Sequence, residues 1–102
     1  MSTSKSLEDI KKLIRKHKEE LKEKYGVKDI GIFGSYVRGE QKERSDVDIL
    51  IDFYPNTEMD LIKFVELEYY LSDLIGVKVD LVTKKALKPR IGMHVLKEVI
   101  YV

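Results

Sequence analysis

Apolar residues recur near the start of the chain at spacings of three and four, which is the period of one helix face. The pattern predicts a helix over Ser6–Lys24, with Ser6 as N-cap, Asp9 in a capping-box position and Gly26 as the stop. His17 falls on the apolar face, and we expect it to pack there, because a lone histidine without a partner is more often structural. The apolar face consists of Leu7, Ile10, Leu13, Ile14, His17 and Leu21.

Alternation of apolar and polar residues predicts three strands further along the chain. They span Val27–Phe33, Val47–Phe53 and Val77–Val82. The second is the clearest, because its odd-numbered positions are all apolar whereas Asp48, Leu50 and Asp52 share the other face. In the third strand, Val77, Val79 and Leu81 point inward, so Asp80 lies on the opposite face.

Two further helices and a small strand complete the pattern. A helix is predicted over Asp60–Ile75, ended by Gly76, and a shorter one runs from about Pro89 to Lys97. A terminal strand is expected over Val99–Val102. The strands are too few for a doubly wound fold, so we expect a small α/β domain with its helices mainly on one sheet face. The apolar set of the longer helix is Leu61, Phe64, Val65, Leu71, Leu74 and Ile75.

Composition narrows the class of protein. The chain has 102 residues, which indicates a single domain over residues 1–102, and its 43% hydrophobic residues favour a folded chain over a disordered one. It has no cysteine, which excludes disulfides, thiolate metal sites and a cysteine nucleophile. No apolar run approaches the length of about 18 residues that a membrane span needs, and the N-terminus has no apolar signal core. We therefore expect a cytoplasmic protein without a membrane segment.

The net charge of +1 hides a strong asymmetry along the chain. Lys5–Lys28 carries a net charge of +4, Asp46–Val82 carries −7, and Thr83–Val102 carries +4 with a single acidic residue. Most acidic residues of the middle segment lie in or near the helical pattern, where a solvated helix face explains them. The carboxylates outside that helix are therefore the candidates for chemistry.

Three aspartates suggest a metal site. Asp46 and Asp48 are two positions apart at the start of a strand, so their side chains share one face about 6.5–7 Å apart. Asp80 joins them if its strand lies beside theirs. Such a set favours a hard divalent cation such as Mg²⁺, since its ligands are carboxylate oxygens. Three carboxylates are also the minimum for a two-metal site in phosphoryl or nucleotidyl transfer.

A glycine–serine pair supplies the second half of the pattern. Gly34 and Ser35 end a strand and lead into a helical start, where backbone N–H groups are free to receive phosphate oxygens. Gly34 allows close approach, and Arg38 neutralises phosphate charge. Each residue alone is more often part of a turn, a cap or an ordinary surface. The joint pattern is what favours a site.

The string GSYVRGEQKERSDVDILID resembles the signature of the minimal nucleotidyltransferases, a branch of the DNA polymerase beta superfamily. The resemblance implies a small polymerase-beta-like palm with a mixed sheet. It also implies two Mg²⁺ ions held by Asp46, Asp48 and Asp80, with ATP as the substrate. The nucleotide-binding residues implied are Gly34, Ser35, Arg38 and Ser45. The matching residues are Gly34, Ser35, Arg38, Gly39, Ser45, Asp46, Asp48 and Asp80.

The resemblance also implies a partner. Members of this family are often the antitoxins of HEPN-domain toxins encoded nearby, and some transfer AMP from ATP onto a tyrosine of the toxin. Two alternatives remain open at this point: transfer to a small-molecule acceptor, and a non-catalytic antitoxin that only binds its partner. Nucleic-acid synthesis is disfavoured, because 102 residues leave no room for the additional domains that a polymerase needs.

Overall fold

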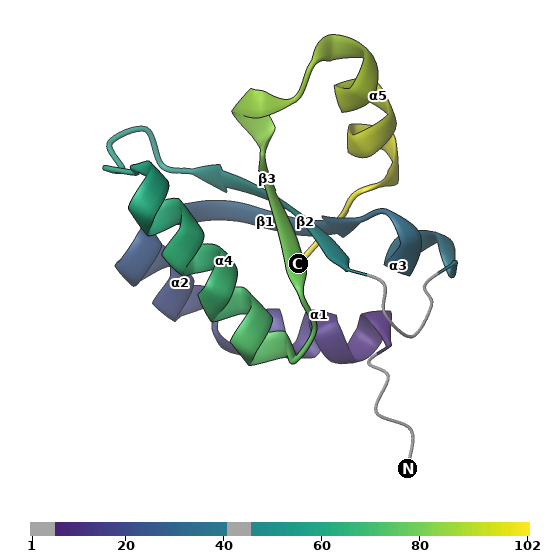
Figure 1. Cartoon of the computed structure of the whole chain (residues 1–102), viewed down its shortest axis with the longest axis horizontal. Coiled ribbons are helices and arrows are strands. Elements are labelled where there is room, and N and C mark those ends of the chain that lie inside the picture. The colour runs from purple at the N-terminus through teal and green to yellow at the C-terminus, as the bar shows by residue number, and fades with distance from the viewer. Residues whose placement is uncertain (1–5, 41–45) are drawn as a thin grey trace.

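The computed structural model describes residues 6–40 and 46–102. Its strands form a central sheet, and its helices lie around this sheet (Figure 1). In chain order they are α1 (Leu7–Lys16), α2 (Lys18–Tyr25), β1 (Val27–Phe33), α3 (Ser35–Arg38), β2 (Val47–Phe53), α4 (Leu61–Ile75), β3 (Val79–Thr83), the 3-10 turn η1 (Lys84–Ala86), α5 (Pro89–Glu98) and β4 (Ile100–Tyr101).

The four described strands form one mixed sheet in the order β3-β2-β1-β4. β1 is antiparallel to both β2 and β4, whereas β2 and β3 are parallel. The chain passes from β2 to β3 through α4, which is the crossover that a parallel pair requires. The predicted strands Val27–Phe33 and Val47–Phe53 are confirmed with their bounds.

One face of the sheet carries the hydrophobic core. Helices α1, α2 and α4 lie against this face, and α5 lies on the other side of the sheet (Figure 1). The prediction of a small α/β fold with helices mainly on one face is therefore confirmed. The fully buried residues of this core come from all three helices and from the two central strands: Ile10, Ile14, Leu21, Ile32, Val47, Ile49, Ile51, Leu67, Leu71 and Ile75.

The first predicted helix is wrong in one respect, because it breaks at His17. Ser6 and Asp9 form the expected capping box, and Gly26 ends the second piece in the left-handed conformation. At the break, Nδ1 of His17 lies 2.9 Å from the carbonyl oxygen of Leu13, which a continuous helix would pair with the His17 N–H. That N–H donates to Ile14 instead, at 3.1 Å. His17 therefore stops α1 rather than only packing.

The buried face of α4 also differs from the prediction. Leu61 and Val65 belong to the predicted apolar set but are 77% and 37% exposed, whereas Leu67, which is outside that set, is fully buried. Val65 and Leu67 are two positions apart, so a helix turns their side chains about 200° from each other. The core row of α4 is Leu67, Leu71 and Ile75, spaced by four residues.

The strand expected at Val77–Val82 begins two residues later, at Val79, and ends at Thr83. It lies at the edge of the sheet, where its outward N–H groups need other acceptors. Two side chains of α4 provide them: Ser72 Oγ accepts from Val79 at 3.0 Å, and a Glu68 carboxylate oxygen accepts from Leu81 at 3.1 Å. These bonds fix β3 to α4.

The C-terminal elements agree with the sequence analysis. α5 starts at Pro89 and ends at Glu98, and β4 lies inside the predicted terminal strand. Among the described residues, no helix combines the length and apolar composition needed to cross a bilayer.

Candidate active site

The parallel pairing of β2 with β3 brings two of the predicted carboxylates together. Asp48 and Asp80 are direct partners in the register, so they occupy adjacent positions on the same face of the sheet. That face is opposite the hydrophobic core, because their neighbours Val47, Ile49 and Val79 are buried against the helices. Asp48 is half-buried and Asp80 is exposed.

Asp46 lies one residue before β2 and is half-buried. The negative charge of Asp46 contributes to raising the pKa of Asp48 and that of Tyr36, which is buried. The pKa of Tyr36 is raised by burial and then by the negative charge of Asp46. Ser45, the remaining residue of the predicted set on this segment, lies outside the described residues.

The pKa of Asp48 is raised above its ordinary value. The largest cause is burial, followed by the negative charges of Asp80 and Asp46, while Arg38 acts in the opposite direction. A carboxylate in this position is more stable when a positive charge lies beside it. The negative charges of Asp46 and Asp80 therefore both act on Asp48.

Gly34 forms the wall against which Asp48 packs. Its backbone has φ 81° and ψ −151°, a region that only glycine populates freely. A Cβ at this position would collide with Oδ2 of Asp48. The residue is therefore glycine for two reasons, its backbone conformation and its contact with a carboxylate of the site. Ser35 follows as the first residue of α3 and is half-buried.

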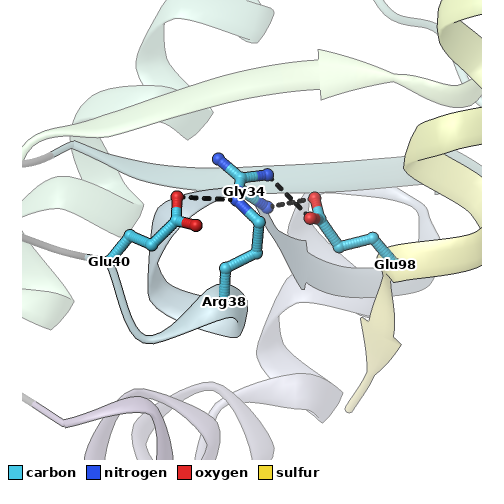
Figure 2. A network of polar contacts seen from close by, with 4 residues as sticks. All are labelled: Gly34, Arg38, Glu40 and Glu98. Carbon is cyan, nitrogen blue, oxygen red and sulfur yellow. Dashed lines mark hydrogen bonds and ion pairs between the residues drawn. The ribbon is translucent and has the colours of Figure 1, made fainter.

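Arg38 stands between two glutamates (Figure 2). Its Nη1 donates to Oε1 of Glu98 at 2.7 Å, and its Nε donates to Oε2 of Glu40 at 3.0 Å. The other oxygen of Glu98 accepts the backbone N–H of Gly34 at 2.7 Å. The end of α5 is thereby joined to the glycine–serine turn.

The two charges at the centre of this network stabilise each other. The pKa of Arg38 is raised, first by its hydrogen bond to Glu98 and then by that to Glu40. Partial burial disfavours the ionised form of Glu98, but the hydrogen bonds from Gly34 and Arg38 outweigh it, so the pKa of Glu98 is lowered. Both groups are therefore charged at neutral pH.

A pocket of about 570 Å³ opens beside these residues, a size typical of small-molecule sites. It gathers Gly34 and Arg38 from the start and end of α3, Asp48 from β2 and Asp80 from β3, whereas Ser35 and Asp46 are not among its lining residues. α5 contributes one wall. The lining residues are Phe33, Gly34, Arg38, Asp48, Asp80, Val82, His94, Val95 and Glu98.

The sequence analysis missed the contribution of α5. His94, Val95 and Glu98 line the pocket, and none of them belongs to the predicted set. One signal was present, because Glu98 is the single acidic residue of the basic segment Thr83–Val102. Its partners are 64 and 60 positions away, so local patterning could not assign them.

The donor chemistry of the site suits a hard divalent cation. Within the described part of the chain, no three histidine, aspartate or glutamate side chains converge into a ready-made metal site. Asp48 and Asp80 are nevertheless adjacent, and the negative charge of Asp80 adds to the burial that raises the pKa of Asp48. Carboxylate oxygens are the ligands that Mg²⁺ prefers.

The comparisons with known proteins agree with this geometry. The model of the nucleotidyltransferase domain family matches residues 14–102. The chain belongs to this family. Over 97 residues, it is 56% identical to protein adenylyltransferase MntA of Thermococcus cleftensis, covering 95% of this chain and 96% of that protein.

Solved structures of nucleotidyltransferases share the fold. A structure assigned as a minimal nucleotidyltransferase superposes with a TM-score of 0.77 at 33% identity, over 97% of this chain and 98% of that one. A toxin–antitoxin structure with AMP-PNP superposes with a TM-score of 0.66 at 27% identity, over 90% of this chain and 68% of that chain. The resemblance to minimal nucleotidyltransferases and the palm-like fold are thus confirmed.

Replacement of Gly34 tests the close contact with Asp48. We expect Gly34→Ala to lower the free energy of unfolding by about 2 kcal/mol or more, because the backbone conformation is strained for alanine and the new methyl group meets Asp48. Urea unfolding followed by circular dichroism measures the change.

Gly39→Ala is the matched control for this prediction. Gly39 also has a positive φ, 72°, but among the described residues no atom lies within 4 Å of an added Cβ. Its expected cost is about 1 kcal/mol, from the backbone alone. Equal costs at the two glycines would contradict the role of the Asp48 contact.

Removal of charge at Asp48 tests the crowding of carboxylates. We expect metal-free Asp48→Asn to be more stable than the parent at pH 7 by up to about 1 kcal/mol, because like charges directly opposite each other destabilise a sheet. The raised pKa of Asp48 sets the pH dependence. Between the unfolded pKa of about 4 and the raised folded value, the native parent holds the extra proton, so its stability falls as the pH rises through this window.

Urea unfolding with a chelator at pH 4 and pH 7 checks this difference. Glu58→Gln is the control, since it removes one charge from an exposed side chain between β2 and α4. An Asp48→Asn protein that is no more stable than the parent at pH 7 would show that the carboxylates do not repel one another appreciably.

Proposed function

We propose that this protein is a Mg²⁺-dependent adenylyltransferase that moves AMP from ATP onto a tyrosine hydroxyl of a HEPN-domain partner, and that it acts as the antitoxin of that partner. The observation that carries the proposal is the meeting of Asp48, Asp80 and Gly34 at one pocket. Membership of the nucleotidyltransferase family gives the reaction class.

The proposed roles follow from the position of each residue. Gly34 and Arg38 present an N–H group and a guanidinium to the pocket and bind phosphate oxygens of ATP. Ser35 adds a hydroxyl at the start of α3. Ser45, beside the aspartates in sequence, completes the proposed nucleotide-binding set.

Asp46, Asp48 and Asp80 are the proposed metal ligands. Asp48 and Asp80 already lie side by side, and Asp46 is close enough to influence the pKa of Asp48. A divalent cation held there would neutralise charge on the triphosphate and would favour ionisation of the attacking hydroxyl. The carboxylates themselves hold the cation on the sheet face that borders the pocket.

The proposed transfer forms one bond and breaks another. The tyrosine oxygen attacks the α-phosphorus of ATP, the bond from that phosphorus to the bridging oxygen breaks, and pyrophosphate leaves. The proton of the hydroxyl passes to the carboxylate of Asp80, which is the exposed member of the adjacent pair. The product carries AMP, whose anionic phosphate and base block the modified tyrosine by charge and by volume.

Two relatives support a protein acceptor. The relative from Thermococcus cleftensis is named a protein adenylyltransferase, and its similarity extends over nearly the whole of both chains. The structure with AMP-PNP is a toxin–antitoxin complex.

Substitution of the aspartates separates nucleotide binding from transfer. We expect Asp46→Asn combined with Asp48→Asn to weaken MgATP binding at least about tenfold, because two ligand charges are lost. Asp80→Ala should retain ATP and lose transfer, since the remaining carboxylates and Gly34 still hold the nucleotide. Calorimetric titration with MgATP measures binding, and Asp52→Asn is the control of equal charge. Unchanged binding in the double variant would exclude these aspartates as ligands.

The proposed acceptor is tested by weighing the partner. Purified protein is incubated with its HEPN-domain neighbour, ATP and Mg²⁺, and intact-mass spectrometry follows both chains. We expect the partner to gain one or more AMP units, and we expect no gain with Asp46→Asn.

Two other results would point to the alternatives. Protection of cells that persists with all three aspartates replaced, and without any change in mass, would favour an antitoxin that acts by binding alone. Consumption of ATP with labelled small-molecule hydroxyl compounds, and not with the protein partner, would favour a small-molecule acceptor.

A further inference from the structure

The carboxylate of Glu98 accepts hydrogen bonds from both groups, Gly34 and Arg38, that the proposed function assigns to phosphate binding. The Oε2 atom of Glu98 accepts the Gly34 N–H at 2.7 Å, and the Oε1 atom accepts from Nη1 of Arg38 at 2.7 Å. Figure 2 shows the side chain reaching across from the end of α5 to both groups. Glu98 therefore takes the place that a phosphate needs.

The chemistry of this contact is that of a bound anion. Two oxygens on one atom, sharing one negative charge, accept from a backbone N–H and from a guanidinium, as two oxygens of a phosphate do. Arg38 does not need Glu98 for charge balance, because Glu40 already accepts from its Nε at 3.0 Å. Of these two glutamates, Glu98 is the one that also accepts the hydrogen bond from the Gly34 N–H.

The negative charges of the pocket disfavour the binding of a nucleotide while Glu98 is in place. Its described lining includes the carboxylates of Asp48, Asp80 and Glu98, and a single guanidinium, that of Arg38. A triphosphate that enters while Glu98 is in place meets both donors engaged and one additional negative charge. Binding at these donors therefore requires that Glu98 leave.

We propose that the carboxylate of Glu98 occupies the hydrogen-bond donors that bind phosphate. It accepts from the Gly34 N–H and the Arg38 guanidinium while no nucleotide is bound, and the triphosphate displaces it. The inference rests on the proposed function, since it takes these two groups as the phosphate site. It makes Glu98 a residue that sets nucleotide affinity and keeps the empty turn ordered.

Displacement needs no movement of the fold. Glu98 is the last residue of α5, and its side chain is 22% exposed, so rotation about its side-chain bonds carries the carboxylate into water. Arg38 is 48% exposed and keeps its bond to Glu40 during the exchange. The exchange also selects for ligands with several anionic groups, because a single phosphate gains little by replacing an equivalent carboxylate.

The test uses inorganic tripolyphosphate, which offers the phosphates without the base and without transfer. Calorimetric titration compares the parent with Glu98→Gln, which keeps the size of the side chain and loses its charge. We expect tripolyphosphate to bind Glu98→Gln about tenfold more tightly, since the ligand no longer displaces a charge-assisted pair. Glu40→Gln, which removes the same charge from Arg38 and leaves the Gly34 contact, should change affinity by less than about twofold.

A second readout follows the donor directly. In the parent, the backbone amide of Gly34 should shift in nitrogen–proton NMR spectra when tripolyphosphate is added, as its acceptor changes from carboxylate to phosphate. In Glu98→Gln without ligand, the chemical shift of the same amide should already differ from that in the parent. Circular dichroism confirms that each variant is folded, and Glu98→Ala, which should also bind more tightly, provides an independent variant.

Three results would overturn the inference. They are weaker or unchanged binding by folded Glu98→Gln and Glu98→Ala, equal tightening in Glu98→Gln and Glu40→Gln, and no binding of tripolyphosphate by any folded variant. AMP transfer to the partner is measured in parallel. Tighter binding without any transfer in the parent would support the exchange and refute the proposed function, whereas intact transfer without tighter binding would overturn the exchange alone.

Discussion

The candidate site depends on the parallel pairing of β2 with β3. This pairing sets Asp48 directly beside Asp80, an arrangement that repulsion between the two carboxylates opposes. Burial on the reverse face decides the balance, because Ile49 and Leu81, one position further on each strand, lie in the core under the helices. Each fully buried aliphatic side chain contributes about 1.5–3 kcal/mol, more than the repulsion costs. A shift of register by one residue would exchange the buried and charged faces, so the core fixes the carboxylates where they are.

Around this pair, negative charge on one side faces the guanidinium of Arg38 on the other. Asp48 packs against the backbone of Gly34, and the N–H of the same glycine donates to Glu98. Gly34 thus lies between two carboxylates, one in the space that a Cβ would fill and one that accepts a hydrogen bond from its backbone N–H. Arg38 counters both, since it is bonded to Glu98 and lowers the raised pKa of Asp48. A cation near Asp48 offsets the negative charge that a triphosphate brings in place of Glu98, so metal and triphosphate should favour each other's binding.

The periodicity of apolar residues predicted most of the helices and strands, because these elements depend mainly on residues close to one another in sequence. The alternation in Val47–Phe53 gave the correct bounds and face, since side chains on a strand alternate whatever lies beyond it. The break at His17 depends on a ring nitrogen meeting one carbonyl oxygen, which no apolar period encodes. The start of β3 depends on Ser72 and Glu68, which reach it from another element. For the candidate site, short motifs predicted Gly34, Asp46 and Asp48 and the strand pattern predicted Asp80, whereas Glu98 meets Gly34 and Arg38 only through folding.

The position of Glu98 rests in turn on a second glycine. β4 follows α5 directly and pairs with β1 through Gly31, where a Cβ would lie 2.6 Å from Cγ2 of Val99 and 3.1 Å from the carbonyl oxygen of Ile100. Only a residue without a side chain lets the end of α5 approach the sheet this closely. The backbone N–H of Val102 then donates to Ile30 at 2.9 Å and closes the edge. Gly34 therefore admits the carboxylate of β2, and Gly31 admits the chain that carries the carboxylate of α5. Gly31 lies in β1 and Gly34 directly follows its last residue, so one short stretch of chain receives both carboxylate-bearing elements.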